Sequence, residues 1–206
     1  MITIIDYGAG NLTSISNMLK RIGEESEITS DVEKINAATK LILPGVGSFD
    51  FGINQLRNAP YFDVLCKKVQ EEKIPILGVC LGMQLLAEGS EEGSTAGLGW
   101  IKGKVKKFDA EKIKLAGLKV PHMGWTDIAV NKPSKILQGL PADAHFYFVH
   151  SYYFSPSQAE DILLTSNYGY SFTSGVEREN IVAVQFHPEK SHKYGMQLYR
   201  NFACLY

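Results

Sequence analysis

The amino-acid sequence predicts an α/β fold: helices cover both faces of a central, mostly parallel sheet, and additional antiparallel strands follow in the second half. In the first half, continuous apolar runs alternate with amphipathic segments, which is typical of buried parallel strands covered by helices. In the second half, apolar and polar residues alternate and the runs lie closer together. The 206 residues, 45% hydrophobic and 21% charged, suit one domain over residues 1–206 with its own core.

The first-half strands are short and almost wholly apolar. They are expected at Ile2–Ile5, Leu41–Leu43 and Ile76–Val79. The expected helices cover residues 12–22, 61–72 and 81–88. Asn11 precedes the first helix as a candidate cap and Gly23 follows it, as is typical of helix ends.

The second half predicts further strands and a closing helix. The strands are expected at residues 105–108, 126–130, 146–153, 172–176 and 181–185, and the helix at 193–204. Their alternating pattern indicates antiparallel or mixed additions to the sheet.

Charge and cysteine content narrow the classes of function. The net charge is −1, so neither nucleic acid nor a membrane is an expected partner. Three cysteines at irregular spacing indicate free thiols in a reducing, cytoplasmic location. No metal-binding motif such as C-x-x-C occurs and no glycine-rich phosphate loop is complete, so neither a metal nor a cofactor is expected.

The segment around Cys80 has the pattern of a nucleophile on a sharp strand-to-helix turn. A buried strand ends at this cysteine, and Gly78 and Gly82 flank it at two residues on either side. Glycines relieve crowding in such a turn, and the following helix start stabilises a thiolate. The backbone N–H of Leu81 is a natural donor to an oxyanion. The alternative is a structural cysteine between packing glycines.

A catalytic cysteine needs a base, and His187 has the best setting among five histidines. It follows an apolar strand, and Glu189 lies two residues on, placed to orient the imidazole. A surface histidine is the alternative, and His122 and His150 compete for the role, whereas His145 and His192 have less in their favour.

A glycine pair follows the second buried strand. In Pro44–Gly47, the glycines allow backbone N–H groups to turn toward an oxyanion, although a plain tight turn would use the same residues.

Together these three segments resemble the class I (triad) glutamine amidotransferases. The segments are G-V-C-L-G-M-Q at 78–84, F-H-P-E at 186–189 and P-G-V-G at 44–47. The resemblance implies a flavodoxin-like three-layer sandwich. Three more segments resemble the glutaminase subunits of imidazole glycerol phosphate synthases within that class: D-Y-G-A-G-N-L at 6–12, P-H-M-G-W at 121–125 and F-V-H-S-Y at 148–152. Thr126 departs from the Asn expected there, and any effect is expected on partner contact.

The resemblance implies a glutaminase with a Cys80, His187 and Glu189 triad. Cys80 would attack the side-chain amide of L-glutamine, and His187 would protonate the departing ammonia and then activate water. Backbone groups near Gly47 and Leu81 would bind the oxyanion. The residues implied to bind glutamine are Gln84, Glu92, Ser151 and Tyr152, with Glu92 on the α-ammonium.

The resemblance also implies a partner, a β/α-barrel cyclase subunit. The two subunits would form a heterodimer in histidine biosynthesis, and ammonia would pass between them through an internal channel. The face with Asn11, residues 121–125 and the mouth of the triad pocket would dock onto the cyclase. Glutaminase activity would stay low until the cyclase binds its ligand, through reorientation of the Val46–Gly47 peptide.

Three other functions stay open on the sequence. The chain could supply ammonia to another synthase, such as one making pyridoxal phosphate, anthranilate or a guanine nucleotide. It could be a cysteine peptidase or deglycase of similar fold. It could also be a catalytically silent scaffold, although the intact triad residues argue against this.

Overall fold

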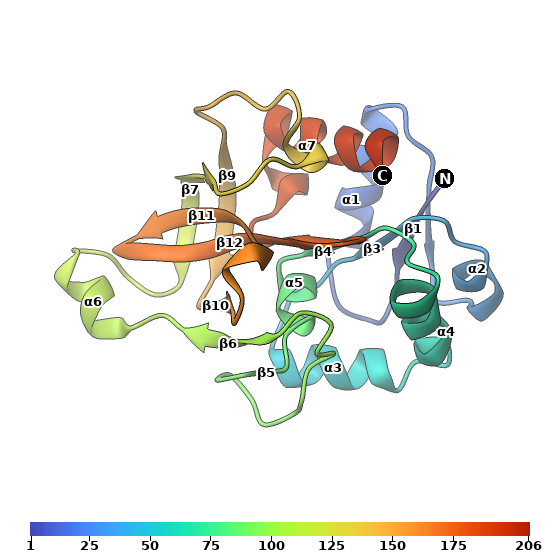
Figure 1. Cartoon of the computed structure of the whole chain (residues 1–206), viewed down its shortest axis with the longest axis horizontal. Coiled ribbons are helices and arrows are strands. Elements are labelled where there is room, and N and C mark those ends of the chain that lie inside the picture. Colours follow the sequence, from blue (N-terminus) through green and yellow to red (C-terminus); the bar gives the residue numbers. More distant parts are fainter.

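An eight-stranded sheet forms the centre of the protein, as described for residues 1–206 by a computed structural model (Figure 1). Five parallel strands come first in the order β2 (Ser26–Thr29), β1 (Ile2–Ile5), β3 (Leu41–Leu43), β4 (Ile76–Val79) and β13 (Ile181–Val184). Antiparallel strands β12 (Tyr170–Arg178), β11 (Ile162–Tyr168) and β8 (Ala129–Val130) complete it. The order of the parallel part is that of flavodoxin-like folds, so the predicted fold class is confirmed.

Helices cover both faces of this sheet, as Figure 1 shows. One face carries α1 (Leu12–Arg21) and α7 (His192–Leu205). The other carries α2 (Val32–Asn36), α3 (Phe49–Arg57), α4 (Phe62–Cys66), which continues as a π-helical turn at Lys67–Glu71, and α5 (Leu81–Leu85). Because both faces are covered, successive residues of the central strands point into different cores, and almost all of them are apolar; the buried Thr3 in β1 is an exception.

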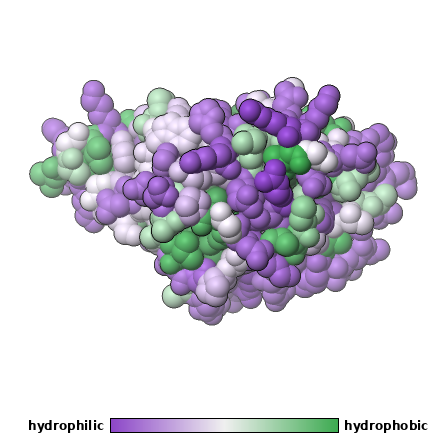
Figure 2. Space-filling model, turned by 90° about the horizontal axis from the view of Figure 1, so that it is seen from above, coloured by the Kyte–Doolittle hydropathy of each residue, from purple (hydrophilic) through white to green (hydrophobic).

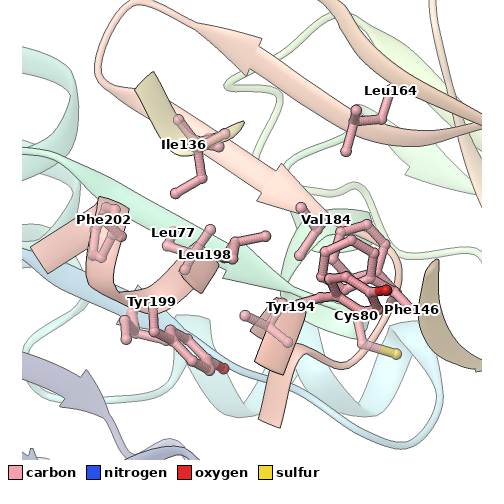
Figure 3. Packing of buried hydrophobic residues seen from close by; sticks show 14 of the residues in the cluster. Leu77, Cys80, Ile136, Phe146, Leu164, Val184, Tyr194, Leu198, Tyr199 and Phe202 are labelled. Atoms are coloured by element: carbon pink, nitrogen blue, oxygen red, sulfur yellow. The ribbon is translucent and has the colours of Figure 1, made fainter. Parts of the chain in front are cut away.

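The core under α7 shows this packing at close range. Leu198 and Phe202 of α7 lie against Leu77 of β4 and Val184 of β13, and all four side chains are fully buried (Figure 3). The same cluster reaches Cys80, where β4 ends. The core thus fixes the two strand ends that carry the candidate nucleophile and base.

Two smaller sheets extend the antiparallel end. One contains β10 (Tyr152–Pro156), β6 (Gly103–Lys107) and β5 (Gly89–Ser90); the other pairs β7 (His122–Asp127) with β9 (His145–His150). A short helix, α6 (Ala110–Leu115), follows β6. The chain passes from one small sheet to the other at Ser151, between β9 and β10.

The structure corrects several boundaries predicted from sequence. The three first-half strands are confirmed residue for residue, whereas β2, a half-exposed edge strand, has no apolar run and was not predicted. The strand at 181–184 is parallel to β4 and central, not an antiparallel addition, because its wholly apolar residues are buried on both faces of the sheet. Asn11 holds the N-cap position of α1, but its side chain makes no cap hydrogen bond. The expected 126–130 and 146–153 strands are each broken in two.

The surface is mostly hydrophilic in the view of Figure 2, with hydrophobic areas that are separate from one another. None of the helices is both long enough and apolar enough to cross a membrane.

The crossing of α7 over the turn at Pro188 gives a stability prediction. A Cβ on Gly195 would lie 1.8 Å from the carbonyl oxygen of Pro188, so Gly195→Ala must displace backbone. We expect Gly195→Ala to lower the free energy of unfolding by about 1–3 kcal/mol in urea titration. Arg200→Ala, an exposed position in the same helix, is the control and should change little. Equal stability of the two variants would contradict this account of the turn.

Candidate active site

The backbone at Cys80 has the strained conformation expected of a nucleophile turn. Its φ and ψ are 54° and −110°, which a side-chain-bearing residue rarely adopts. A Cβ on Gly82 would lie 1.9 Å from the carbonyl oxygen of Leu43, and one on Gly78 would lie 2.9 Å from the Ala183 Cβ. Both glycines are therefore required by close packing around the turn, as the sequence predicted.

Helix α5 is shorter than predicted and ends at Leu85 instead of residue 88. Five residues make a small helix dipole, so this helix contributes less to thiolate stabilisation than the sequence suggested. The positive charge that a thiolate needs must come from elsewhere in the pocket.

His187 and Glu189 meet as the sequence predicted. The His187 Nδ1 and the Glu189 Oε1 are 2.7 Å apart, and each side chain is only 2% exposed. Glu189 lies on the 3-10 turn Pro188–Lys190. The Ser191 hydroxyl donates to the His187 carbonyl at 2.6 Å and accepts from the backbone N–H of Tyr147 at 3.0 Å, which fastens the turn to β9.

The surroundings of His187 favour its protonated form. Burial opposes the positive charge, but the neighbouring Cys80 and Glu189 favour it more strongly, and the net effect raises the pKa to about 10. The Nε2 atom is buried and makes no well-aligned hydrogen bond within the protein, so it is available to a reacting group. Such contacts commonly tighten only when substrate binds. The arrangement suits an imidazolium beside a cysteine thiolate.

One pocket brings together every predicted site residue except Glu189, which lies behind the His187 ring. The pocket is lined by Gly47, Cys80, Leu81, Gln84, Glu92, Ser151, Tyr152 and His187, and also by Val46, Val149, His150 and Lys190. The lining comes from loops and strand ends far apart in the sequence, gathered at the carboxyl ends of β3, β4 and β13.

The candidate oxyanion loop, Pro44–Gly47, is packed against the turn at Cys80. The Tyr7 hydroxyl donates to the carbonyl of Pro44 at 2.5 Å, and a Cβ on Gly45 would lie 2.8 Å from that of Leu81. Gly47 has a φ of 111°, which glycine adopts readily. The Leu81 N–H donates to the Gly45 carbonyl at 3.3 Å. This donor is thus already engaged, and the 45–47 loop must shift before Leu81 can hold an oxyanion.

Two candidate glutamine ligands each have an acceptor left for a substrate. Both amide hydrogens of Gln84 are used, on the carbonyl of Tyr152 at 2.9 Å and on the Gln185 Oε1 at 3.0 Å, so its oxygen faces the pocket. Glu92 accepts from the backbone N–H of Phe49 at 2.8 Å through Oε2. Its second carboxylate oxygen makes no protein hydrogen bond and suits a cationic group.

The competing histidines are engaged elsewhere. His150 lines the pocket, but its Nδ1 contacts the Tyr152 carbonyl at 2.7 Å and its Nε2 contacts the Nδ1 of His122 at 3.0 Å. The Nε2 of His122 lies 2.8 Å from the Thr126 hydroxyl. Neither ring has a free nitrogen for the thiol, so His187 is the base that the geometry supports. The hydroxyl of Thr126, the residue that departs from the family pattern, faces this interior pair.

Sequence reasoning missed two residues at the site. Tyr7 anchors the oxyanion loop, and Gln185 directs its Nε2 toward the Cys80 Sγ at 3.8 Å. A signal for Gln185 existed, because it is the only polar residue in the apolar run Ile181–Phe186. No cluster of three or more His, Cys, Asp or Glu side chains is arranged to hold a metal ion.

Known proteins are similar to this chain over nearly its whole length. The model of the family "Glutamine amidotransferase class-I" matches residues 3–205. Imidazole glycerol phosphate synthase subunit HisH 2 of Methanococcus maripaludis is 52% identical over 203 residues, 98% of each chain. The protein of that name from Pseudomonas aeruginosa is 49% identical over 205 residues, covering all of both chains.

Solved structures are similar in fold. A glutamine amidotransferase superposes with a TM-score of 0.74 at 21% identity, covering 98% of this chain and 97% of that one. PurLQS of Thermotoga maritima has a TM-score of 0.73 at 17% identity, covering 98% and 96%. At these identities the likeness concerns the fold alone.

The strained backbone at Cys80 predicts a difference in stability between two variants that both lack the thiol. Removing the Cβ relieves the positive φ, so Cys80→Gly should be more stable than Cys80→Ala by about 1 kcal/mol in urea unfolding. At Ala203 in helix α7 the order should reverse, with Ala203→Gly losing about 1 kcal/mol. A Cys80→Ala variant as stable as Cys80→Gly would mean that the turn is not strained.

The raised pKa of His187 gives a pH dependence of stability. Protonated His187 stabilises the folded state fully below its unfolded pKa of about 6.5, and this stabilisation is lost as the pH rises toward about 10. Glu189→Gln removes a carboxylate that favours the charge. The difference in unfolding free energy between parent and variant should therefore be largest near about pH 6 and shrink toward pH 10. A difference that grew with pH would contradict the imidazolium.

Proposed function

We propose that this chain, which belongs to the class-I glutamine amidotransferase family, is the glutaminase subunit of an imidazole glycerol phosphate synthase. The observation that carries the proposal is the pocket in which Cys80 and His187 face each other, with Glu189 bound to the far side of the imidazole. Full-length relatives at 42–52% identity are named as this subunit, which favours it over glutaminases for other acceptors.

In the first half of the reaction, the Cys80 thiolate attacks the side-chain carbonyl carbon of L-glutamine. The carbonyl oxygen becomes an oxyanion, and backbone N–H groups at Gly47 and Leu81 stabilise it. The C–N bond then breaks as His187 gives its Nε2 proton to the departing ammonia. A γ-glutamyl thioester on Cys80 remains, with a neutral imidazole beside it.

In the second half, the neutral His187 takes a proton from a water molecule, whose oxygen attacks the thioester carbon. The C–S bond breaks, glutamate leaves, and the thiolate and imidazolium are restored. Glu189 keeps Nδ1 protonated throughout, so that Nε2 is the atom that gives and takes the proton.

The glutamine substrate is held through both of its charged ends, the α-ammonium and the α-carboxylate. The free carboxylate oxygen of Glu92 and the Oε1 of Gln84 accept from the α-ammonium. Ser151 and Tyr152, where β9 passes into β10, hold the carboxylate end. These roles follow from the available donors and acceptors in the pocket.

Activity depends on a shift of the oxyanion loop. The Leu81 N–H is occupied by the carbonyl of Gly45, so the free subunit binds the oxyanion poorly. Reorienting the Val46–Gly47 peptide toward the pocket supplies one donor, and an accompanying shift of the Gly45 carbonyl frees the Leu81 N–H. The loss of one such donor costs about 2.7–4 kcal/mol in the barrier, so we expect low activity before the partner is engaged.

The partner is the β/α-barrel cyclase subunit, which consumes the ammonia delivered through a channel between the two active sites. The relatives are named as subunits of a synthase, which supports such a heterodimer. Met123 and Trp125 on β7 are apolar yet 60% and 44% exposed, and Asn11 is also exposed, as a docking face requires. Three free cysteines suit the reducing cytoplasm where we place the complex.

The proposal is tested by glutamate release from L-glutamine, by the chain alone and with a cyclase subunit plus its nucleotide ligand. We expect strong stimulation by the liganded cyclase, and a loss of at least about a thousandfold with Cys80→Ala. Cys204→Ala, which removes an exposed thiol, should leave the rate unchanged. A Cys80-dependent rate without stimulation would point to another synthase as the partner. Absence of any glutamate release would overturn the glutaminase.

A further inference from the structure

A buried chain of side-chain amides ends on the nucleophile. Gln84 donates one amide hydrogen to the Gln185 Oε1 at 3.0 Å and the other to the Tyr152 carbonyl at 2.9 Å. Because the Gln185 oxygen is occupied as an acceptor, its amide nitrogen must point the other way, and it lies 3.8 Å from the Cys80 Sγ. Gln185 is fully buried, and so no solvent competes for this donor.

A second series of hydrogen bonds, through two histidines, also ends on the Tyr152 carbonyl. The positions of its protons follow from the partners. A carbonyl only accepts, so the Nδ1 of His150, at 2.7 Å, carries a hydrogen. Burial lowers the pKa of His150 to about 3 and that of His122 to about 4, so both rings are neutral near pH 7.

The neutral state fixes the remaining bonds. The Nε2 of His150 must accept, so the Nδ1 of His122 donates to it across 3.0 Å. The Nε2 of His122 must then accept in turn, and the Thr126 hydroxyl donates to it at 2.8 Å. The Tyr152 carbonyl thus determines the tautomer of His150, and His150 determines that of His122. Thr126 on β7 is the donor at the far end of this chain.

We propose that Gln185 is a further residue of the reaction, one that donates a hydrogen bond to the Cys80 thiolate and stabilises it. The Tyr152 carbonyl is the junction that keeps Gln84, and through it Gln185, in the donating orientation. The histidine chain that starts at Thr126 holds this junction in place. The proposal rests on Cys80 being the nucleophile, as proposed above.

A purely structural role for these groups would account for their hydrogen bonds, since buried polar groups are generally paired. It would not account for the direction of the last donor. If Gln185 only filled space, its amide could turn and direct its oxygen to the sulfur. The bond from Gln84 prevents this, because an amide hydrogen already occupies that oxygen.

The test measures alkylation of Cys80 by iodoacetamide as a function of pH, without glutamine or any partner. A background of Cys66→Ser and Cys204→Ser leaves Cys80 as the single thiol. Gln185→Met keeps a side chain of similar length but removes the donor. We expect the alkylation midpoint to rise by about one pH unit and the rate at neutral pH to fall about tenfold.

Controls separate this effect from a loss of packing. Ser174→Ala removes a different fully buried polar group, a hydroxyl on the neighbouring strand, and should leave the pH profile unchanged. Thr126→Val should shift the midpoint in the same direction by a smaller amount, while Thr126→Ser retains the donor and should not. If Gln185→Met does not fold, the Thr126 pair decides the proposal.

An unshifted alkylation midpoint in a folded Gln185→Met variant would overturn the proposal. If Gln185→Met does not fold, equal pH profiles for Thr126→Val and Thr126→Ser would overturn it. Neither outcome bears on glutamine hydrolysis, since no glutamine is present. If the protein released no glutamate from glutamine but Gln185→Met still raised the alkylation midpoint, only the proposed substrate would be rejected.

Discussion

The rest of the site depends on one backbone constraint, the positive φ of 54° at Cys80 where β4 turns into α5. This conformation is costly for any residue with a Cβ. The Cys80 sulfur lies at the margin of the core cluster (Figure 3). Gly78 and Gly82 permit this conformation by close packing. The cores on both faces of the sheet hold it, because β4 is central and buried throughout.

Strand pairing then brings the other reacting groups to the thiol. Val79 of β4 lies opposite Val184 of β13, so the residues that follow each strand emerge side by side at the same edge of the sheet. Gln185 thereby reaches the sulfur, and His187 follows on a turn fastened by Ser191. In this buried setting Cys80 and Glu189 favour a protonated His187, so positive charge beside the sulfur does not depend on the dipole of the short helix α5 alone.

The sequence predicted several features that depend on local pattern, although helices α2 and α3 and strand β11 were not expected. Continuous apolar runs marked β1, β3 and β4, and glycines at fixed spacing marked the turn at Cys80. Features set by contacts between distant segments were not predictable. The edge strand β2 lacks an apolar run, and the engagement of the Leu81 N–H by Gly45 depends on how two loops pack. The tautomers of His122 and His150 likewise follow only from their three-dimensional neighbours.

If Cys80 is the nucleophile that attacks glutamine, a reactive glutamine analogue should label it covalently. The protein is treated with a glutamine analogue that carries a diazoketone in place of the side-chain amide, digested, and examined by mass spectrometry. We expect one adduct, on the peptide with Cys80, formed in step with loss of glutaminase activity and prevented by L-glutamine. An adduct on Cys66 or Cys204 instead, or inactivation with Cys80 unmodified, would contradict this role of Cys80.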